Sequence, residues 1–184
     1  FARRRRAAGV WAWLTGPLGL RVHSMRLIIA AIGRLKDGAE RELLAGYRDR
    51  FDAMARRLGL APVAWHEVAE SRAGTAAKRC SEEGGALLKL ARDADLILVL
   101  DERGKSLTSE AFARLLSKYR DDGTGTLALL IGGPDGLAED VRTAAHVKLA
   151  LGAMTLPHGL ARIVLAEQLY RAATILAGHP YHRA

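Results

Sequence analysis

Two uninterrupted apolar runs, LILVL at residues 96–100 and LALLI at residues 127–131, constrain the fold more than any other feature of this chain. A strand that is apolar on both faces, without alternation, is typical of a parallel sheet covered by helices on both sides. Shorter strands are indicated at residues 26–32, 63–68 and 147–151. The pattern predicts one α/β domain with five strands and a mainly parallel sheet.

The segments around these strands have the three- and four-residue apolar spacing of helices. Helices are predicted over residues 38–58, 75–91, 109–119, 138–145 and 160–177, with Thr108 or Ser109 as the cap of the third. A chain of 184 residues is long enough to bury a full core in a single domain. No apolar run approaches the length of a membrane span, so we expect a soluble protein.

The formal net charge of +8 at pH 7 is unevenly placed. Residues 1–24 hold five arginines and no acid, which leaves only +3 for residues 25–184. We expect residues 1–24 to be upstream sequence translated from a misplaced start, disordered and outside the domain. A basic RNA-binding arm is the alternative, whereas the interrupting Gly16, Pro17 and Gly19 disfavour a signal peptide. The near-neutral remainder is expected to bind free RNA poorly.

The cysteine and histidine residues bear on two questions: the redox compartment of the protein and the presence of a metal site. The single cysteine, Cys80, cannot form an internal disulfide, which fits the reducing cytoplasm, and we expect it to be a packing residue. The six histidines show no HxxxH or HxxE spacing, so no metal site is predicted.

Three unusual loops follow predicted strands, at residues 101–106, 132–136 and 152–158. Ligands of open α/β sheets bind at the carboxyl ends of strands, so these loops are expected to form one pocket. Their glycines would let main-chain N–H and C=O groups approach a ligand, which suits an adenine or a ribose. Each loop alone also fits an ordinary turn, and GGPDG matches neither the dinucleotide fingerprint nor the P-loop.

The C-terminal segment is unusually rich in functional side chains. Tyr181, His182 and Arg183 offer a ring to stack, a group that ionises near neutrality and a bidentate phosphate donor; a disordered polar terminus is the alternative. Arg171 follows Glu167 by four residues, which also fits a plain surface ion pair. Arg162 and Arg171 are nine residues apart and lie on opposite helix faces, so both cannot serve one pocket in one subunit.

Five ordered segments carry a family resemblance: LDERGKSLTSEAFA at 100–113, LLIGGPDGL at 129–137, MTLPHGLAR at 154–162, EQLYRA at 167–172 and PYHR at 180–183. Over Met25 to Ala184 the chain resembles the RlmH family, the 23S rRNA (pseudouridine-N3)-methyltransferases of the SPOUT superfamily. The resemblance implies a SPOUT-type domain with a C-terminal trefoil knot, S-adenosyl-L-methionine as cofactor, large-subunit rRNA in the assembled ribosome as substrate, and a homodimer. In that dimer the tail of one subunit completes the site of the other.

The resemblance also implies roles for individual residues. Cofactor contacts are expected at Leu100, Gly133, Gly152, Ala153, Met154, Thr155, Leu156 and Pro157. Substrate and catalytic roles are expected at His158, Arg171, Tyr181, His182 and Arg183, with His182 as the base. Two other functions stay open: a SPOUT methyltransferase that acts on tRNA, and a ribosome-binding module without catalysis.

Overall fold

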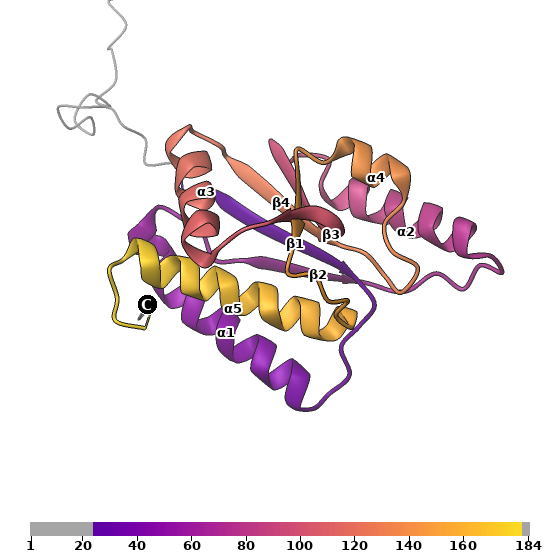
Figure 1. Ribbon diagram of the computed structural model, residues 1–184, viewed down its shortest axis with the longest axis horizontal. Coiled ribbons are helices and arrows are strands. Elements are labelled where there is room, and N and C mark those ends of the chain that lie inside the picture. The colour runs from indigo at the N-terminus through magenta and orange to yellow at the C-terminus, as the bar shows by residue number, and fades with distance from the viewer. Residues whose placement is uncertain (1–23, 182–184) are drawn as a thin grey trace, which may run out of the picture.

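The five predicted strands form one all-parallel sheet in the computed structural model, which describes residues 24–181 (Figure 1). Its order is β2-β1-β4-β3-β5, so the prediction of an α/β fold with a parallel sheet is confirmed. The elements along the chain are β1 (Arg26–Ile32), α1 (Ala39–Ala55), η1 (Arg56–Leu58), β2 (Ala64–Val68), α2 (Ala76–Leu90), β3 (Leu96–Ser106), α3 (Ser109–Asp121), β4 (Thr126–Ile131), α4 (Glu139–Ala144), β5 (Val147–Ala150) and α5 (His158–Leu176).

The two apolar runs lie side by side near the middle of the sheet. Leu96–Leu100 of β3 pairs in register with Leu127–Ile131 of β4, and every residue of β4 is buried. Alternate side chains enter two separate cores. Leu127 and Leu129 pack with the core of α1, α3 and α5, whereas Ala128 and Leu130 pack with that of α2 and α4. Helices therefore cover both faces, as the continuous hydrophobicity predicted (Figure 1).

The third strand is longer than predicted. Residues 101–106 were expected to form a loop, but β3 continues through them to Ser106 and pairs again with β5 after a register shift between Leu100 and Lys105. Gly104 makes this possible, because a Cβ there would lie 2.7 Å from the backbone of Leu149. The polar sequence of residues 101–106 did not indicate a strand, because this part of β3 is stabilised only by its close approach to β5.

Other boundaries agree closely with the prediction. The helix α5 begins at His158, two residues earlier than expected, with Pro157 at its N-cap, and the side chain of Thr108 caps α3 by accepting from the Ala111 N–H at 3.2 Å. None of the helices within residues 24–181 is long and apolar enough to cross a membrane. The trefoil knot stays a prediction, because strand order and register do not determine how the chain threads. The expectations for residues 1–23, His182 and Arg183 lie outside the described residues.

Candidate functional site

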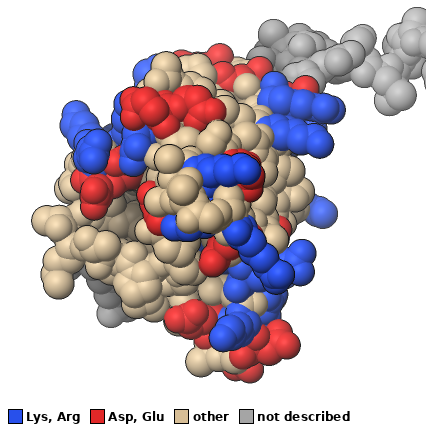
Figure 2. All heavy atoms as spheres, turned by 90° about the vertical axis from the view of Figure 1, so that its right-hand side faces the viewer, with Lys and Arg blue, Asp and Glu red and all other residues tan. Residues whose placement is uncertain are grey.

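A cavity of about 750 Å³ opens at the carboxyl ends of β3, β4 and β5. Small-molecule sites typically measure about 300–1,000 Å³ and occupy this edge of a parallel sheet. All three predicted loops contribute to its lining, which comprises residues 100–103, 131–137, 142, 149, 151, 152, 154–158 and 161. Figure 2 faces this edge of the molecule and shows basic and acidic side chains interleaved there. The expectation that the loops meet in one pocket is confirmed.

Glycines bring the main chain of the second loop to the cavity wall. A Cβ on Gly133 would lie 2.8 Å from Glu83 Oε2 and 2.9 Å from Ile32 Cγ2, so no larger residue fits. The Gly136 N–H donates to the Gly133 carbonyl at 3.0 Å, and Gly136 has a φ of +85°, which only glycine adopts without strain. The three glycines of this loop, Gly132, Gly133 and Gly136, therefore contribute only peptide groups to the lining.

The helix α2 fixes this loop from behind. Arg79 donates to both carboxylate oxygens of Asp135, at 2.7 and 3.1 Å, and this hydrogen bonding holds the pKa of Asp135 below its usual range. Cys80 donates from Sγ to the Asp135 carbonyl at 3.3 Å. Cys80, expected to be a packing residue, thus contacts the loop that forms the cavity floor.

An ion pair joins β3 and α4 at the cavity wall. Arg142 Nε donates to Asp101 Oδ2 at 2.6 Å, and the side chain of Asp101 is only 2% exposed. Burial acts to raise the pKa of Asp101, but the hydrogen bond from Arg142 and that from the Arg103 N–H outweigh it, so the pKa is lowered. The pair therefore remains ionised at neutral pH.

His158 lies at the start of α5, where a charged cluster fixes the helix. Its Nε2 is 3.9 Å from Glu70 Oε1. One turn later Arg162, the side chain of which is 1% exposed, donates to the Ile32 carbonyl at the end of β1 and to Glu67 Oε1 at 3.3 Å. Burial lowers the pKa of Arg162, and the nearby carboxylates, Glu67 foremost, oppose that effect. The cluster anchors the first turn of α5, which carries His158, to the ends of β1 and β2.

The third loop is the most open part of the site. Gly152, Met154, Thr155, Leu156 and Pro157 all line the cavity, whereas Ala153 does not. The side chain of Met154 is 84% exposed, and Leu156 is also exposed. Main-chain groups and apolar side chains therefore border the mouth of the cavity.

The structure does not bring Arg171 and Tyr181 to this cavity. Arg171 Nε donates to Glu167 Oε1 at 2.9 Å, and the ring of Tyr181 lies 5.1 Å from the Arg171 guanidinium and 4.7 Å from the ring of Tyr170. Burial, together with the charge of Glu167, raises the pKa of Tyr181. The surface pair expected of Arg171 and Glu167 is present, and within one subunit the tail packs on its own α5, far from His158.

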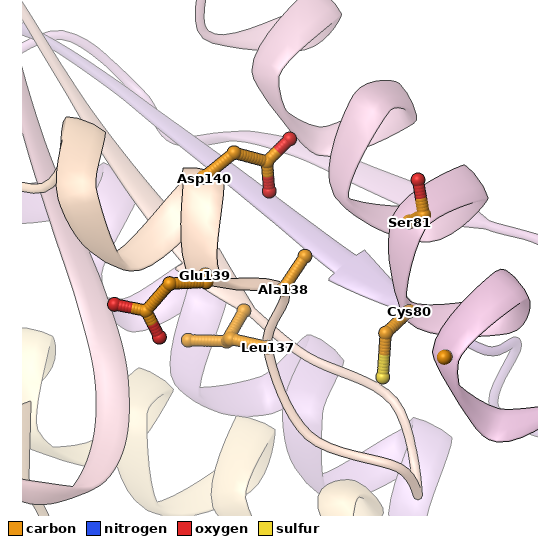
Figure 3. Close-up of a pocket in the computed structure, with 7 residues that line it drawn as sticks. Cys80, Ser81, Leu137, Ala138, Glu139 and Asp140 are labelled. Atoms are coloured by element: carbon orange, nitrogen blue, oxygen red, sulfur yellow. The ribbon is translucent and has the colours of Figure 1, made fainter.

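A smaller hollow of about 380 Å³ lies between α2 and α4 (Figure 3). Its walls include Cys80, Ser81, Glu139 and Asp140. None of the three loops predicted to hold a ligand contributes a residue to its lining. Within residues 24–181 no group of three or more histidine, cysteine or acidic side chains is placed to hold a metal ion.

Several residues that shape the site were not predicted. Glu83, Arg79, Arg142, Glu67 and Glu70 all come from elements distant in sequence from the partners that they contact. A charged residue usually indicates solvent exposure, so a single sequence carries no signal for these contacts. For Glu83 alone a weak signal existed, because it precedes the Gly84-Gly85 pair in a helix that packs closely on α4.

Comparison with known proteins gives a consistent result. The model of a family described as predicted SPOUT methyltransferase matches residues 25–182. A protein from Methylobacterium nodulans, named ribosomal RNA large subunit methyltransferase H, is 53% identical over 159 residues, which cover 86% of this chain and 98% of that protein. A protein of the same name from Bradyrhizobium diazoefficiens is 50% identical over 160 residues, which cover 87% and 100%.

Solved structures resemble the chain more distantly. A probable methylase family protein from Haemophilus influenzae is 13% identical, with a TM-score of 0.49, and the match covers 89% of this chain and 72% of that one.

Proposed function

Because this chain belongs to the SPOUT methyltransferase family, we propose that it transfers a methyl group from S-adenosyl-L-methionine to the RNA of the large ribosomal subunit. The observation that carries the proposal is the single cavity formed by the GGPDG and MTLPH loops at the carboxyl edge of the sheet. The substrate class follows from the relatives named ribosomal RNA large subunit methyltransferase H, which this chain matches along nearly their whole length.

The cavity fits the proposed cofactor in size and in chemistry. An adenosine presents edges that pair with peptide N–H and C=O groups, and three glycines of the second loop, Gly132, Gly133 and Gly136, are in the cavity lining. We assign cofactor binding to Leu100, Gly133, Gly152, Ala153, Met154, Thr155, Leu156 and Pro157. When bound, the cofactor supplies an electrophilic methyl group on a sulfonium. The loops would exclude water and hold that methyl group in line with the acceptor.

The acceptor that we propose is N3 of a pseudouridine in 23S rRNA. This imide nitrogen must lose its proton before it attacks, and His182 is assigned as the base because its ordinary pKa lies near neutrality. Tyr181 would stack on the base, and Arg171 or Arg183 would hold a phosphate or the developing anion. His158, at the cavity, completes the assigned set.

A homodimer reconciles these assignments with the structure. Arg171 lies 13 residues after His158 on α5, which corresponds to about 20 Å along a helix. A partner subunit would therefore have to supply Arg171 and the tail to each cavity. The same geometry agrees with the burial of Arg162 inside its own subunit, on the opposite helix face.

The substrate is proposed to be the assembled ribosome in the cytoplasm. Residues 25–184 carry a net charge of only +3, and the edge in Figure 2 shows no extended area of a single sign. Binding to the phosphate backbone alone would be weak with so small an excess. The protein should therefore need a shaped substrate.

Transfer of labelled methyl from S-adenosyl-L-methionine to assembled ribosomes, separated subunits and tRNA tests the substrate class, using ribosomes from a strain that lacks the modification. The proposal predicts label in large-subunit RNA, and only in assembled ribosomes. Label in tRNA would show that the substrate is tRNA and not the RNA of the large subunit. If the protein binds ribosomes but transfers no label and does not bind the cofactor, it is a ribosome-binding module without catalytic activity.

A further inference from the structure

The ion pair of Asp101 and Arg142 leaves most of the arginine's hydrogen-bonding capacity unused. Asp101 Oδ2 accepts from Arg142 Nε at 2.6 Å, and Asp101 Oδ1 accepts from the Arg103 N–H at 2.9 Å. Both carboxylate oxygens are thus engaged, while the guanidinium, which has five N–H donors, gives one of them to Asp101. Neither Nη group makes a hydrogen bond to the described residues, although Nη1 forms a long ion pair with Glu139.

Of the two Nη groups, Nη2 lies beside the second loop of the cavity. Arg142 is part of the cavity lining, and its Nη2 lies 3.6 Å from the position that a Cβ on Gly136 would occupy. Nη1 is 3.8 Å from Glu139 Oε2, which exceeds hydrogen-bond distance, and Glu139 is 80% exposed. The side chain of Arg142 is itself only 21% exposed. A mostly buried guanidinium, held by Asp101, is thus part of the wall of the space where a ligand would lie.

We propose that Arg142 binds the α-carboxylate of the methyl donor through its Nη groups, and that Asp101 holds the guanidinium in place for this contact. The inference rests on the proposed function. A planar guanidinium forms two parallel hydrogen bonds with a carboxylate, and fixing it beforehand reduces the entropy lost on binding. The amino-acid end of the donor is a zwitterion. Arg142 and Asp101 together carry no net charge, and a neutral pair that presents guanidinium donors matches such a group.

Arg103 is the alternative cation at this wall. It lines the same cavity, but its side chain is exposed, whereas that of Arg142 is mostly buried and oriented by Asp101. A flexible exposed arginine loses more rotamer freedom on binding. Arg103 therefore serves as the matched control, since it lies on the same cavity and carries the same charge.

The test is calorimetric binding of two ligands to the full-length protein. S-adenosylhomocysteine keeps the amino-acid group, whereas 5′-methylthioadenosine keeps the adenosine and the thioether without it. Arg142→Gln is expected to weaken S-adenosylhomocysteine binding about tenfold or more and to leave methylthioadenosine binding within about twofold. Arg103→Gln should change neither affinity. Arg142→Lys, which keeps the charge beside Asp101 but lacks the planar donor pair, should fold and still lose affinity for S-adenosylhomocysteine alone.

The outcomes separate this inference from the proposed function. Equal weakening of both ligands by the Arg142 variants, or no weakening, would overturn the carboxylate contact while leaving the cofactor site intact. A selective loss in Arg103→Gln would move the contact to that residue and also overturn the inference. If the wild-type protein binds neither ligand, the proposed cofactor fails and the inference fails with it.

Discussion

At the scale of single residues, Gly133 is the position where the sequence motif and the structure agree most directly. A methyl group there would overlap Glu83 Oε2 and Ile32 Cγ2, at 2.8 and 2.9 Å, and Glu83 is buried. Gly133→Ala is therefore expected to destabilise the fold by about 1–3 kcal/mol and to weaken S-adenosylhomocysteine binding. Urea unfolding and calorimetry measure the two effects.

Gly152→Ala is the control for that substitution. Nothing lies within 4 Å of a Cβ at Gly152, and its φ is not positive. Its free energy of unfolding should stay within about 0.5 kcal/mol of wild type. Comparable destabilisation by both substitutions would contradict the packing argument at Gly133.

Asp101 gives the stability of the protein a defined pH dependence. Although burial acts to raise the pKa of Asp101, the contacts with Arg142 and the Arg103 N–H lower it in the folded state. A lowered pKa stabilises the fold above the unfolded value, which is about 3.9, and the contribution disappears as pH falls through the folded value. Asp101→Asn should lose about 2–4 kcal/mol at pH 7.

Urea unfolding of both proteins between pH 7 and pH 2.5 measures this dependence. The difference between wild type and Asp101→Asn should be constant from pH 7 to about pH 5 and should shrink below about pH 4. A difference that stays the same throughout would show that the carboxylate charge contributes nothing to stability.

Residue types alone predicted part of this chemistry. The glycines of GGPDG were predicted to line the pocket because turn residues follow an apolar strand, whereas Asp101, expected in a loop, is a buried residue of β3. The partners Arg142 and Glu83 were not predicted, because Arg142 is 41 positions from Asp101 and Glu83 is 50 positions from Gly133, and the packing that joins them is not encoded in the local pattern. A buried charge looks like a surface charge until its partner is known.

At the scale of elements, the start of α5 depends on Arg162. This arginine joins α5 to the Ile32 carbonyl of β1 and to Glu67 of β2, and its Nε has no hydrogen-bond partner among the described residues. Removing Arg162 takes the side-chain donor away from the Ile32 carbonyl and one of two cations away from Glu67, which keeps Arg41. Arg162→Met is therefore expected to cost about 3–5 kcal/mol of folding free energy.

Arg114→Met provides the comparison, since Arg114 is an exposed arginine on α3. The free energy of unfolding of Arg114→Met, measured by thermal and urea unfolding, should lie within about 0.5 kcal/mol of the wild-type value. If Arg162→Met proves equally mild, the buried network does not anchor α5, and His158 must be positioned by other contacts.

The sequence pattern identified the elements better than their ends. The two central strands were predictable because buried parallel strands are continuously apolar, and the three shorter ones from brief apolar or β-branched runs. The extension of β3 through residues 101–106 was not, since a polar segment with Gly104 has no strand pattern of its own and is ordered by β5. The start of α5 was placed two residues late, at Leu160, because Pro157 and His158 were assigned to the loop before the helix.

At the scale of the whole molecule, the cavity and the C-terminal tail lie at opposite ends of α5. Tyr181 and Arg171 contact Glu167 and Tyr170, whereas His158 lines the cavity. Periodicity showed that Arg162 and Arg171 face opposite ways, but the separation of tail and cavity became visible only in the fold. Strand order, which places β4 between β1 and β3, likewise has no local signal.

A complementation experiment tests the shared site that follows from this separation. Gly133→Ala impairs the cavity and Arg171→Ala impairs the tail, so each homodimer should be inactive. After unfolding and refolding the two together, heterodimers would contain one intact cavity with one intact tail, and about a quarter of wild-type activity should return. No recovery, with mixed dimers verified by differential tags, would contradict a site shared between subunits.

The central claim is the reaction itself, and mass spectrometry of the RNA product tests it most directly. Ribosomes from a strain that lacks the modification would be incubated with the protein and S-adenosyl-L-methionine, and the large-subunit RNA digested to nucleosides. The account predicts N3-methylpseudouridine, formed by the wild-type protein and strongly reduced with His182→Ala. A different methylated nucleoside, or none under conditions where the cofactor binds, would contradict it.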